Sequence, residues 1–250
     1  MSSKKIIKGC IAVILCAGLL SACAENGRMP GFEIDTGRPS VTAHAGAMLT
    51  LPNKPYSVRK SVRAGADIVE IDVTFRPDGT PVMKHASSPG KRGGAMLYKG
   101  FAEVAKSGTC RINLDLKSSA NLPEVERLAR EYGLSERVFF TGVGEEWAVK
   151  ARAETDIPYY LNVVVDERRR DDPGYARELA EKIMSLGAIG LNCEYTGISK
   201  TLVDTMRENG LLVSAWTVNG RGDMQAMLDA GVDNITTRRP AALMRMMAQG

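Results

Sequence analysis

The segment Ile68-Val69-Glu70-Ile71-Asp72-Val73 decides the fold, because it is the clearest of eight short apolar runs in the 250-residue chain. Stretches with apolar residues three and four apart separate the runs, as in helices that bury one face. Alternating strands and helices predict a parallel sheet, and eight strands favour a closed (β/α)8 barrel, the TIM barrel, over an open doubly wound sheet. No glycine-rich phosphate fingerprint follows the first run, which argues against a dinucleotide-binding fold. The eight runs are Val41–Ala45, Ile68–Val73, Ile112–Leu116, Val138–Thr141, Tyr160–Val165, Ala188–Asn192, Leu212–Trp216 and Asn234–Thr236.

The composition is that of a globular protein, with 44% hydrophobic and 25% charged residues. The formal net charge of +4 comes mainly from residues 1–22, which hold Lys4, Lys5 and Lys8 and no acid; the rest of the chain has 30 basic and 29 acidic residues. A nucleic-acid-binding domain should carry a basic stripe on its folded part. We therefore expect no nucleic-acid partner. No feature of the sequence indicates a protein partner. The uninterrupted alternation of strand-like and helical stretches predicts one domain over residues 40–250.

Residues 1–22 have the pattern of a secretory signal peptide: three lysines precede the apolar run Cys10–Leu20, which is too short to span a bilayer. The run ends in Leu20-Ser21-Ala22-Cys23, which resembles the bacterial lipobox, where the cysteine is lipidated and becomes the mature N-terminus. An ordinary signal peptide that contains a cysteine is the alternative. We expect a lipoprotein anchored at the extracytoplasmic face of a membrane in the cell envelope, with residues 23–39 as a tether.

The five cysteines do not form a disulfide framework or a metal site under this interpretation. Cys10 and Cys16 leave with the signal peptide, and Cys23 carries lipid. Cys110 and Cys193 remain, each beside a strand-like run. We expect both to be buried small side chains.

Two carboxylates two residues apart, Glu70 and Asp72, project from one face of a strand that is otherwise apolar. Burying them without compensation is very unfavourable, so they indicate a hard divalent metal with oxygen ligands. A solvated edge strand is the alternative. Asp115 and Lys117 repeat this spacing on the next run and could add a third carboxylate and a positive charge beside a phosphate; a simple surface ion pair would also explain them.

The chain contains two histidines, His44 and His85, and each ends an extended segment. Active-site loops of a barrel begin at the ends of strands, although a single histidine is more often a surface or core residue. Two imidazoles can exchange the roles of general base and general acid near neutral pH. Together with a metal held by carboxylates and with a lysine, they suit hydrolysis of a phosphodiester.

The ordered set of motifs over residues 41 to about 246 resembles the glycerophosphodiester phosphodiesterase family. No single motif is as specific as the set. The motifs are His44-Ala45-Gly46, Gly65-Ala66-Asp67-Ile68-Val69-Glu70-Ile71-Asp72-Val73, Asp78-Gly79-Thr80-Pro81-Val82-Met83-Lys84-His85, Leu114-Asp115-Leu116-Lys117, Trp216-Thr217-Val218-Asn219 and Gly231-Val232-Asp233-Asn234-Ile235-Thr236-Thr237 with Arg239-Pro240 after it.

The resemblance implies a TIM barrel of the phospholipase C-like phosphodiesterase type with one divalent metal, Mg2+ or Ca2+. It implies that a glycerol hydroxyl attacks phosphorus and expels the other alcohol, and that water then opens the cyclic phosphate. For Trp216, which lies at a strand end, the resemblance implies a contact with the substrate; simple packing at the barrel mouth is the alternative. The implied roles are acid–base catalysis for His44 and His85, metal binding for Glu70, Asp72 and Asp115 (where the family usually has Glu), phosphate contact for Lys117, and packing against the substrate alcohol for Trp216.

Three departures from the family pattern bear on specificity. Ala45 stands where the family usually has an arginine that contacts phosphate, and Arg238, after the last strand, is the candidate substitute. Ala86 replaces the aspartate that usually follows the second histidine. The segment Ala86–Leu97 is shorter than the usual insertion that shapes the substrate pocket.

The leading hypothesis is metal-dependent hydrolysis of small-molecule glycerophosphodiesters to an alcohol and glycerol 3-phosphate, in phospholipid degradation and scavenging of phosphate or glycerol. A lysophospholipase D-like activity on lipid substrates is the second. A non-catalytic lipoprotein that binds a phosphate ligand is the third, motivated by Ala45.

Overall fold

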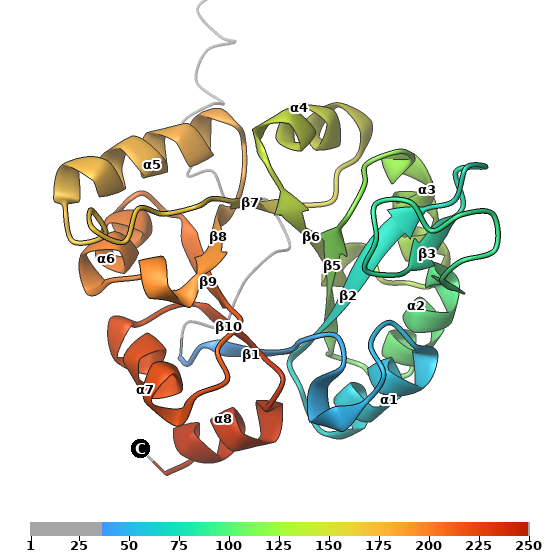
Figure 1. Cartoon of the computed structure of the whole chain (residues 1–250), viewed down its shortest axis with the longest axis horizontal. Helices are drawn as coiled ribbons and strands as arrows, with labels where there is room; N and C mark the ends of the chain where they lie inside the picture. The colour runs from blue at the N-terminus through green and yellow to red at the C-terminus, as the bar shows by residue number, and fades with distance from the viewer. Residues whose placement is uncertain (1–36, 250) are drawn as a thin grey trace, which may run out of the picture.

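The structure, a computed structural model, describes residues 37–249. The predicted signal peptide, Cys23 and most of the predicted tether lie outside the described residues. Figure 1 shows a ring of strands surrounded by helices. The strands are β1 (Ser40–Ala43), β2 (Ile68–Phe75), β3 (Pro81–Met83), β4 (Ala95–Met96), β5 (Arg111–Leu116), β6 (Val138–Val143), β7 (Tyr159–Asn162), β8 (Gly190–Glu194), β9 (Leu212–Trp216) and β10 (Asn234–Thr237).

Eight of these strands are parallel and close into a barrel. The order runs β1-β10-β9-β8-β7-β6-β5-β2, and β1 pairs with both β10 and β2, so no parallel strand is left at an edge. This confirms the predicted (β/α)8 barrel. The fifth strand is shorter than the predicted Tyr160–Val165, since β7 ends at Asn162 and the side chain of Val164 is 96% exposed.

The helices cover the outside of the barrel (Figure 1). In α3 the predicted spacing holds, because Leu122, Val125, Leu128 and Ala129 are all buried. The helices are α1 (Pro55–Arg63), α2 (Leu97–Ala105), α3 (Leu122–Glu131), α4 (Glu145–Glu154), α5 (Pro173–Ser185), α6 (Lys200–Glu208), α7 (Arg221–Ala230) and α8 (Pro240–Met247), with 3-10 turns at Ala47–Leu49, Ser135–Arg137 and Tyr195–Gly197.

The interruption between β2 and α2 is a small antiparallel extension of the barrel. β3 pairs with the end of β2, and β4 pairs with β3. The Lys84 N–H then donates to the Asp72 carbonyl at 3.0 Å. His85, which follows directly, is thereby held above the end of β2.

The core lies inside the barrel and between the barrel and the helices. All eight residues of β2 are buried, as expected for a strand covered on both faces. Cys110 and Cys193 are buried free thiols, as predicted. Among the helices within residues 37–249, none has the length and apolar content needed to cross a bilayer.

Candidate active site

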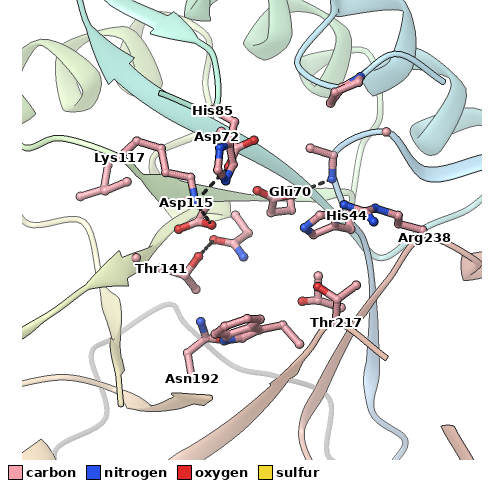
Figure 2. A pocket seen from close by; sticks show the side chains of 18 of the residues that line it. His44, Glu70, Asp72, His85, Asp115, Lys117, Thr141, Asn192, Thr217 and Arg238 are labelled. Atoms are coloured by element: carbon pink, nitrogen blue, oxygen red, sulfur yellow. Dashed lines mark hydrogen bonds and ion pairs between the residues drawn. The ribbon is translucent and has the colours of Figure 1, made fainter. Parts of the chain in front are cut away.

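Three carboxylates converge at the end of the barrel where the strands terminate. Glu70 and Asp72 come from β2, and Asp115 stands directly opposite Asp72 in the β2–β5 register. Residues two apart on a strand share a face, so the register places all three on the same side of the sheet. Each offers an oxygen, and these atoms lie within 4.8 Å of one another (Figure 2).

Two of the carboxylate oxygens are buried without a hydrogen-bond partner among the described residues: Glu70 Oε1 and Asp115 Oδ1. Glu70 Oε2 accepts the Ala45 N–H at 2.6 Å. Burial, with the Asp72 and Asp115 charges next in importance, raises the pKa of Glu70. Burial also raises the pKa of Asp115, against the opposing effect of Lys117. Two such oxygens, with clustered negative charge, fit a hard divalent cation.

Lys117 already contacts this cluster. Its Nζ lies 2.7 Å from Asp115 Oδ2 and 3.1 Å from Asp72 Oδ1. Burial alone would lower the pKa of Lys117, but the two carboxylates together raise it, so the ammonium keeps its proton. A fixed positive charge therefore lies at the edge of the acidic cluster; the sequence analysis predicts that this charge contacts a phosphate.

Asn53 is a residue of this site that sequence reasoning missed. Its Nδ2 donates to Asp72 Oδ2 at 2.7 Å, and its Oδ1 accepts the Asp72 N–H at 3.0 Å. It is buried and has a φ of 58°, a conformation that asparagine adopts more readily than most residues. The signal in the sequence was an asparagine in the turn Pro52-Asn53-Lys54, directly before a helix that begins at Pro55.

His44 follows β1, and its backbone N–H donates to Thr237 on β10 at 3.0 Å. Its Nδ1 is buried without a hydrogen-bond partner among residues 37–249. Burial, and after it the positive charge of Arg238, lowers the pKa of His44 to about 4, while Asp72 opposes the shift. The imidazole is therefore neutral near pH 7 and can accept a proton.

His85 is exposed and approaches the same cluster from the hairpin side. In Figure 2, His44 and Arg238 lie on one side of Glu70, while His85 and Lys117 lie on the other. Both histidines border a single cavity of about 720 Å³ that also contains the three carboxylates. The structure thus brings together the two imidazoles and the acidic cluster that the sequence singled out.

Trp216 and Arg238 also line this cavity, from the ends of β9 and β10. Trp216 is 36% exposed, consistent with a place at the mouth. The Arg238 backbone N–H donates to Asn219 Oδ1 at 3.0 Å, which holds the loop in place. Ala45, which is almost fully buried, lines the same cavity. Arg238 therefore reaches the cavity that an arginine at position 45 would have served.

Polar residues that sequence reasoning did not identify line the interior wall of the cavity. Thr141 Oγ1 donates to Asn113 Oδ1 at 2.8 Å, and Asn192 Nδ2 donates to Asn162 Oδ1 at 3.0 Å. They come from β5, β6, β7 and β8, each inside a run that reads as an apolar strand. Hydrogen-bonding groups therefore surround the space next to the carboxylates, which suits a polar substrate.

Comparison with known proteins identifies the family of the chain. The sequence model of the glycerophosphoryl diester phosphodiesterase family matches residues 101–242, a segment that contains Asp115, Lys117, Trp216 and Arg238. A glycerophosphodiester phosphodiesterase of Caldanaerobacter subterraneus subsp. tengcongensis is 24% identical over 251 aligned positions, which cover 84% of this chain and 98% of that protein.

Solved structures share the fold. A Silicibacter pomeroyi protein assigned to the glycerophosphoryl diester phosphodiesterases superposes with a TM-score of 0.73 at 19% identity, over 90% of this chain and 98% of that one. An Oleispira antarctica phosphodiesterase, solved with the product sn-glycerol-3-phosphate, superposes with a TM-score of 0.68 at 19% identity, over 84% and 97%. Since the family match spans more than half of the sequence, the chain belongs to the glycerophosphoryl diester phosphodiesterase family and is a phosphoric diester hydrolase.

Proposed function

We propose that this protein hydrolyses glycerophosphodiesters to an alcohol and glycerol 3-phosphate, with a divalent metal and with His44 and His85 as the acid–base pair. The observation that carries the proposal is the single cavity in which both imidazoles face a cluster of three carboxylates. The relative from Oleispira antarctica, which holds the product glycerol 3-phosphate, supports the choice of substrate class.

Glu70, Asp72 and Asp115 would hold the metal. The two unpartnered oxygens, Glu70 Oε1 and Asp115 Oδ1, supply negative ligand atoms that no donor of the described chain satisfies. Mg2+ and Ca2+ are the ions that prefer such an all-oxygen donor set. When bound, the ion would supply positive charge that stabilises the phosphoryl oxygens as charge develops on them.

The neutral His44 imidazole fits the role of general base in the first step. It takes the proton of a glycerol hydroxyl as that oxygen forms a bond to phosphorus, and His85 gives a proton to the alcohol oxygen whose bond to phosphorus breaks. In the second step the roles reverse: His85 accepts a proton from water, whose oxygen bonds to phosphorus, and His44 returns a proton to the glycerol oxygen that leaves. Both histidines end the cycle in their starting states.

Lys117 and Arg238 provide positive charge at two sides of the cavity. Lys117 directly follows β5, and its Nζ contacts Asp72 of β2 and Asp115 of β5. Arg238 lies beside His44 in Figure 2, and its positive charge lowers the His44 pKa. We propose that Arg238 binds a phosphate oxygen in place of the arginine absent at position 45, and that Trp216 packs against the substrate alcohol.

The direct test is turnover by the purified protein. With Mg2+ or Ca2+, it should release glycerol 3-phosphate from glycerophosphocholine, glycerophosphoethanolamine or glycerophosphoglycerol, and EDTA should stop the reaction. His44→Ala and His85→Ala should each reduce kcat by about 10²–10⁴-fold, the usual contribution of a general acid or base. Unchanged activity in either variant contradicts its assignment. If no diester is turned over, while His44→Ala keeps the affinity for a phosphate ligand, the protein is a binding lipoprotein instead.

A second candidate activity, on lysophospholipids, is favoured by two exposed leucines at the cavity. Leu49 is fully exposed and Leu51 is 65% exposed, on either side of Thr50, which lines the cavity. An acyl chain would cover these side chains. Rates on monoacylated and deacylated substrates distinguish the two activities, and Leu51→Ser should reduce only the rate on the monoacylated substrate.

We also propose that the protein is a lipoprotein of the cell envelope, anchored through Cys23 at the extracytoplasmic face of a membrane. The lipobox-like Leu20-Ser21-Ala22-Cys23 supports this proposal. Two or more acyl chains would hold the protein stably, because a single chain binds only marginally. Cys23→Ser should move the protein from the membrane fraction to the soluble fraction, and an unchanged distribution contradicts the proposal.

A further inference from the structure

A second cavity, of about 230 Å³, lies between α7 and α8, two helices that are neighbours in the ring (Figure 1). Three arginines line it: Arg221 at the start of α7, Arg239 directly before α8, and Arg245 within α8. Met224 and Met246 supply an apolar wall. No acidic residue lines this cavity, and it shares no lining residue with the cavity of the carboxylates.

The three guanidinium groups have no carboxylate partner in the described part of the chain. Within residues 37–249, none of the three forms an ion pair with a carboxylate, and the side-chain hydrogen bond among them runs from Arg239 Nη1 to the Asn219 carbonyl at 3.2 Å. Arg127 on α3 shows the usual arrangement instead, since it pairs with both Glu124 and Glu131. All three arginines are exposed, so water screens part of their mutual repulsion, and an anion bound between them would reduce it further.

Two further features point to a phosphate group as this anion. Planar guanidinium groups bind phosphate through paired hydrogen bonds, which explains three arginines better than three lysines would. Arg221 occupies the first position of α7 and therefore lies at the positive end of the helix dipole; Asp223, in the same turn, does not line the cavity. The small volume and the buried Met224 suit a phosphate with at most a short apolar substituent.

We propose that the α7–α8 cavity is a second phosphate-binding site, for inorganic phosphate, a small phosphate ester or a phospholipid headgroup. It is separate from the active site but adjacent to it. Arg239 follows Arg238 of the catalytic cavity, and Asn219 anchors both: its Oδ1 accepts the Arg238 N–H, and its carbonyl accepts Arg239 Nη1. The inference does not depend on the proposed activity.

The test is an NMR titration of the full chain in EDTA, following the backbone amides of residues 220–224, 239 and 241–249. Inorganic phosphate, glycerol 3-phosphate and monomeric dihexanoyl phosphatidylglycerol are added separately, with NaCl at equal ionic strength as the reference. We expect saturable shifts of these amides with at least one phosphate probe. A response to the soluble phosphates or to the short-chain lipid identifies the source of the phosphate group.

The double variant Arg221→Gln/Arg245→Gln should weaken this binding about tenfold or more, since two charge-assisted contacts are lost. Arg177→Gln is the matched control, because Arg177 is an exposed arginine of α5 without an ion pair among the described residues, and it should leave the affinity unchanged. The single variants keep the test decisive if the double variant does not fold. Amides that do not shift, that shift equally with NaCl, or that respond equally in the Arg221 and Arg245 variants overturn the proposal.

Discussion

The side-chain amide of Asn53 holds Asp72 by two hydrogen bonds at once, one to Oδ2 at 2.7 Å and one from the Asp72 backbone N–H at 3.0 Å. The remaining carboxylate oxygen, Oδ1, is left facing Lys117. Asn53 contacts none of the reacting groups directly. It acts as a positioning residue, because it fixes the orientation of a carboxylate that would bind the metal.

Loss of this pair should weaken metal binding. Asn53→Gly removes the side chain but tolerates the φ of 58°, whereas Asn53→Ala also strains the backbone. Both variants should bind Mg2+ or Ca2+ about 10–100-fold more weakly, the usual effect of removing a partner of a metal ligand. Calorimetric titration of the purified variants measures this. Wild-type affinity in Asn53→Gly would contradict the positioning role.

Gly142 on β6 should be indispensable to the acidic cluster. A Cβ at this position would lie 2.3 Å from Asp115 Oδ1 and 2.5 Å from the Leu116 carbonyl, and its φ is +72°. Gly142→Ala should displace Asp115 and abolish metal binding and activity. Gly133→Ala is the matched control, since its φ is +66° but no atom lies within 4 Å of the added Cβ. Both variants should lose about 1–2 kcal/mol from the left-handed backbone. Thermal melts with and without Mg2+ measure metal binding in each variant. An increase in Tm with Mg2+ in Gly142→Ala would contradict this prediction.

Glu70→Gln should abolish metal binding without lowering the stability of the metal-free protein. The amide oxygen of glutamine can still accept the Ala45 N–H, while a buried negative charge disappears. Without metal, we expect the variant to be at least as stable as the wild type near neutral pH. Excess Mg2+ or Ca2+ should raise the free energy of unfolding of the wild type by about 2.7 kcal/mol at one hundred times Kd, and with it the Tm; the variant should lose both effects.

The stability of the wild type and of Glu70→Gln should depend differently on pH. Because the folded-state pKa of Glu70 is raised, the protonated form favours folding: this contribution is full below the unfolded value of 4.5 and is lost as pH rises through the folded value. In EDTA, the stability of the wild type should therefore fall with rising pH in this window by more than that of Glu70→Gln. Denaturant unfolding across this range measures the difference, and parallel curves would contradict the burial of a charged Glu70.

The acid limb of kcat/KM should lie far below the ordinary histidine range. Burial and Arg238 lower the pKa of His44 from 6.5 to about 4, so the base stays unprotonated until the solution is strongly acidic. A bound cation would disfavour the imidazolium further. The measurement is a pH–rate profile at saturating metal. An acid limb near 6.5 would show that His44 is not the base in the free enzyme.

Arg238→Ala should lower kcat/KM about 10–100-fold, the effect of losing a charge-assisted phosphate contact. It should also move the acid limb upward, because the charge that lowers the His44 pKa is gone. Ala45→Arg in the Arg238→Ala background should recover part of the loss, since position 45 lines the same cavity. An unchanged kcat/KM in Arg238→Ala, or an unchanged acid limb, would contradict this role.

Much of the site could be predicted from local sequence because strand periodicity is local. Glu70 and Asp72 share a face through their spacing of two, and each histidine ends an extended segment. Glycines that follow helices, such as Gly65 and Gly231, have positive φ, which is also a local property of the sequence. The predicted end of β7 was less accurate. The strand ends at Asn162, but the apolar residues Val163 and Val164 continue the sequence pattern beyond it.

The sequence by itself determined the barrel and its catalytic candidates, because burial patterns of strands and helices repeat over a few residues. Only the tertiary structure decided which partners these side chains meet. The β2–β5 register sets Asp115 opposite Asp72, the turn at Asn53 brings an amide to that carboxylate, and α7 packs beside α8 so that three arginines share one cavity. Such contacts join residues far apart in the chain, and they depend on strand register and loop conformation, which no short pattern encodes.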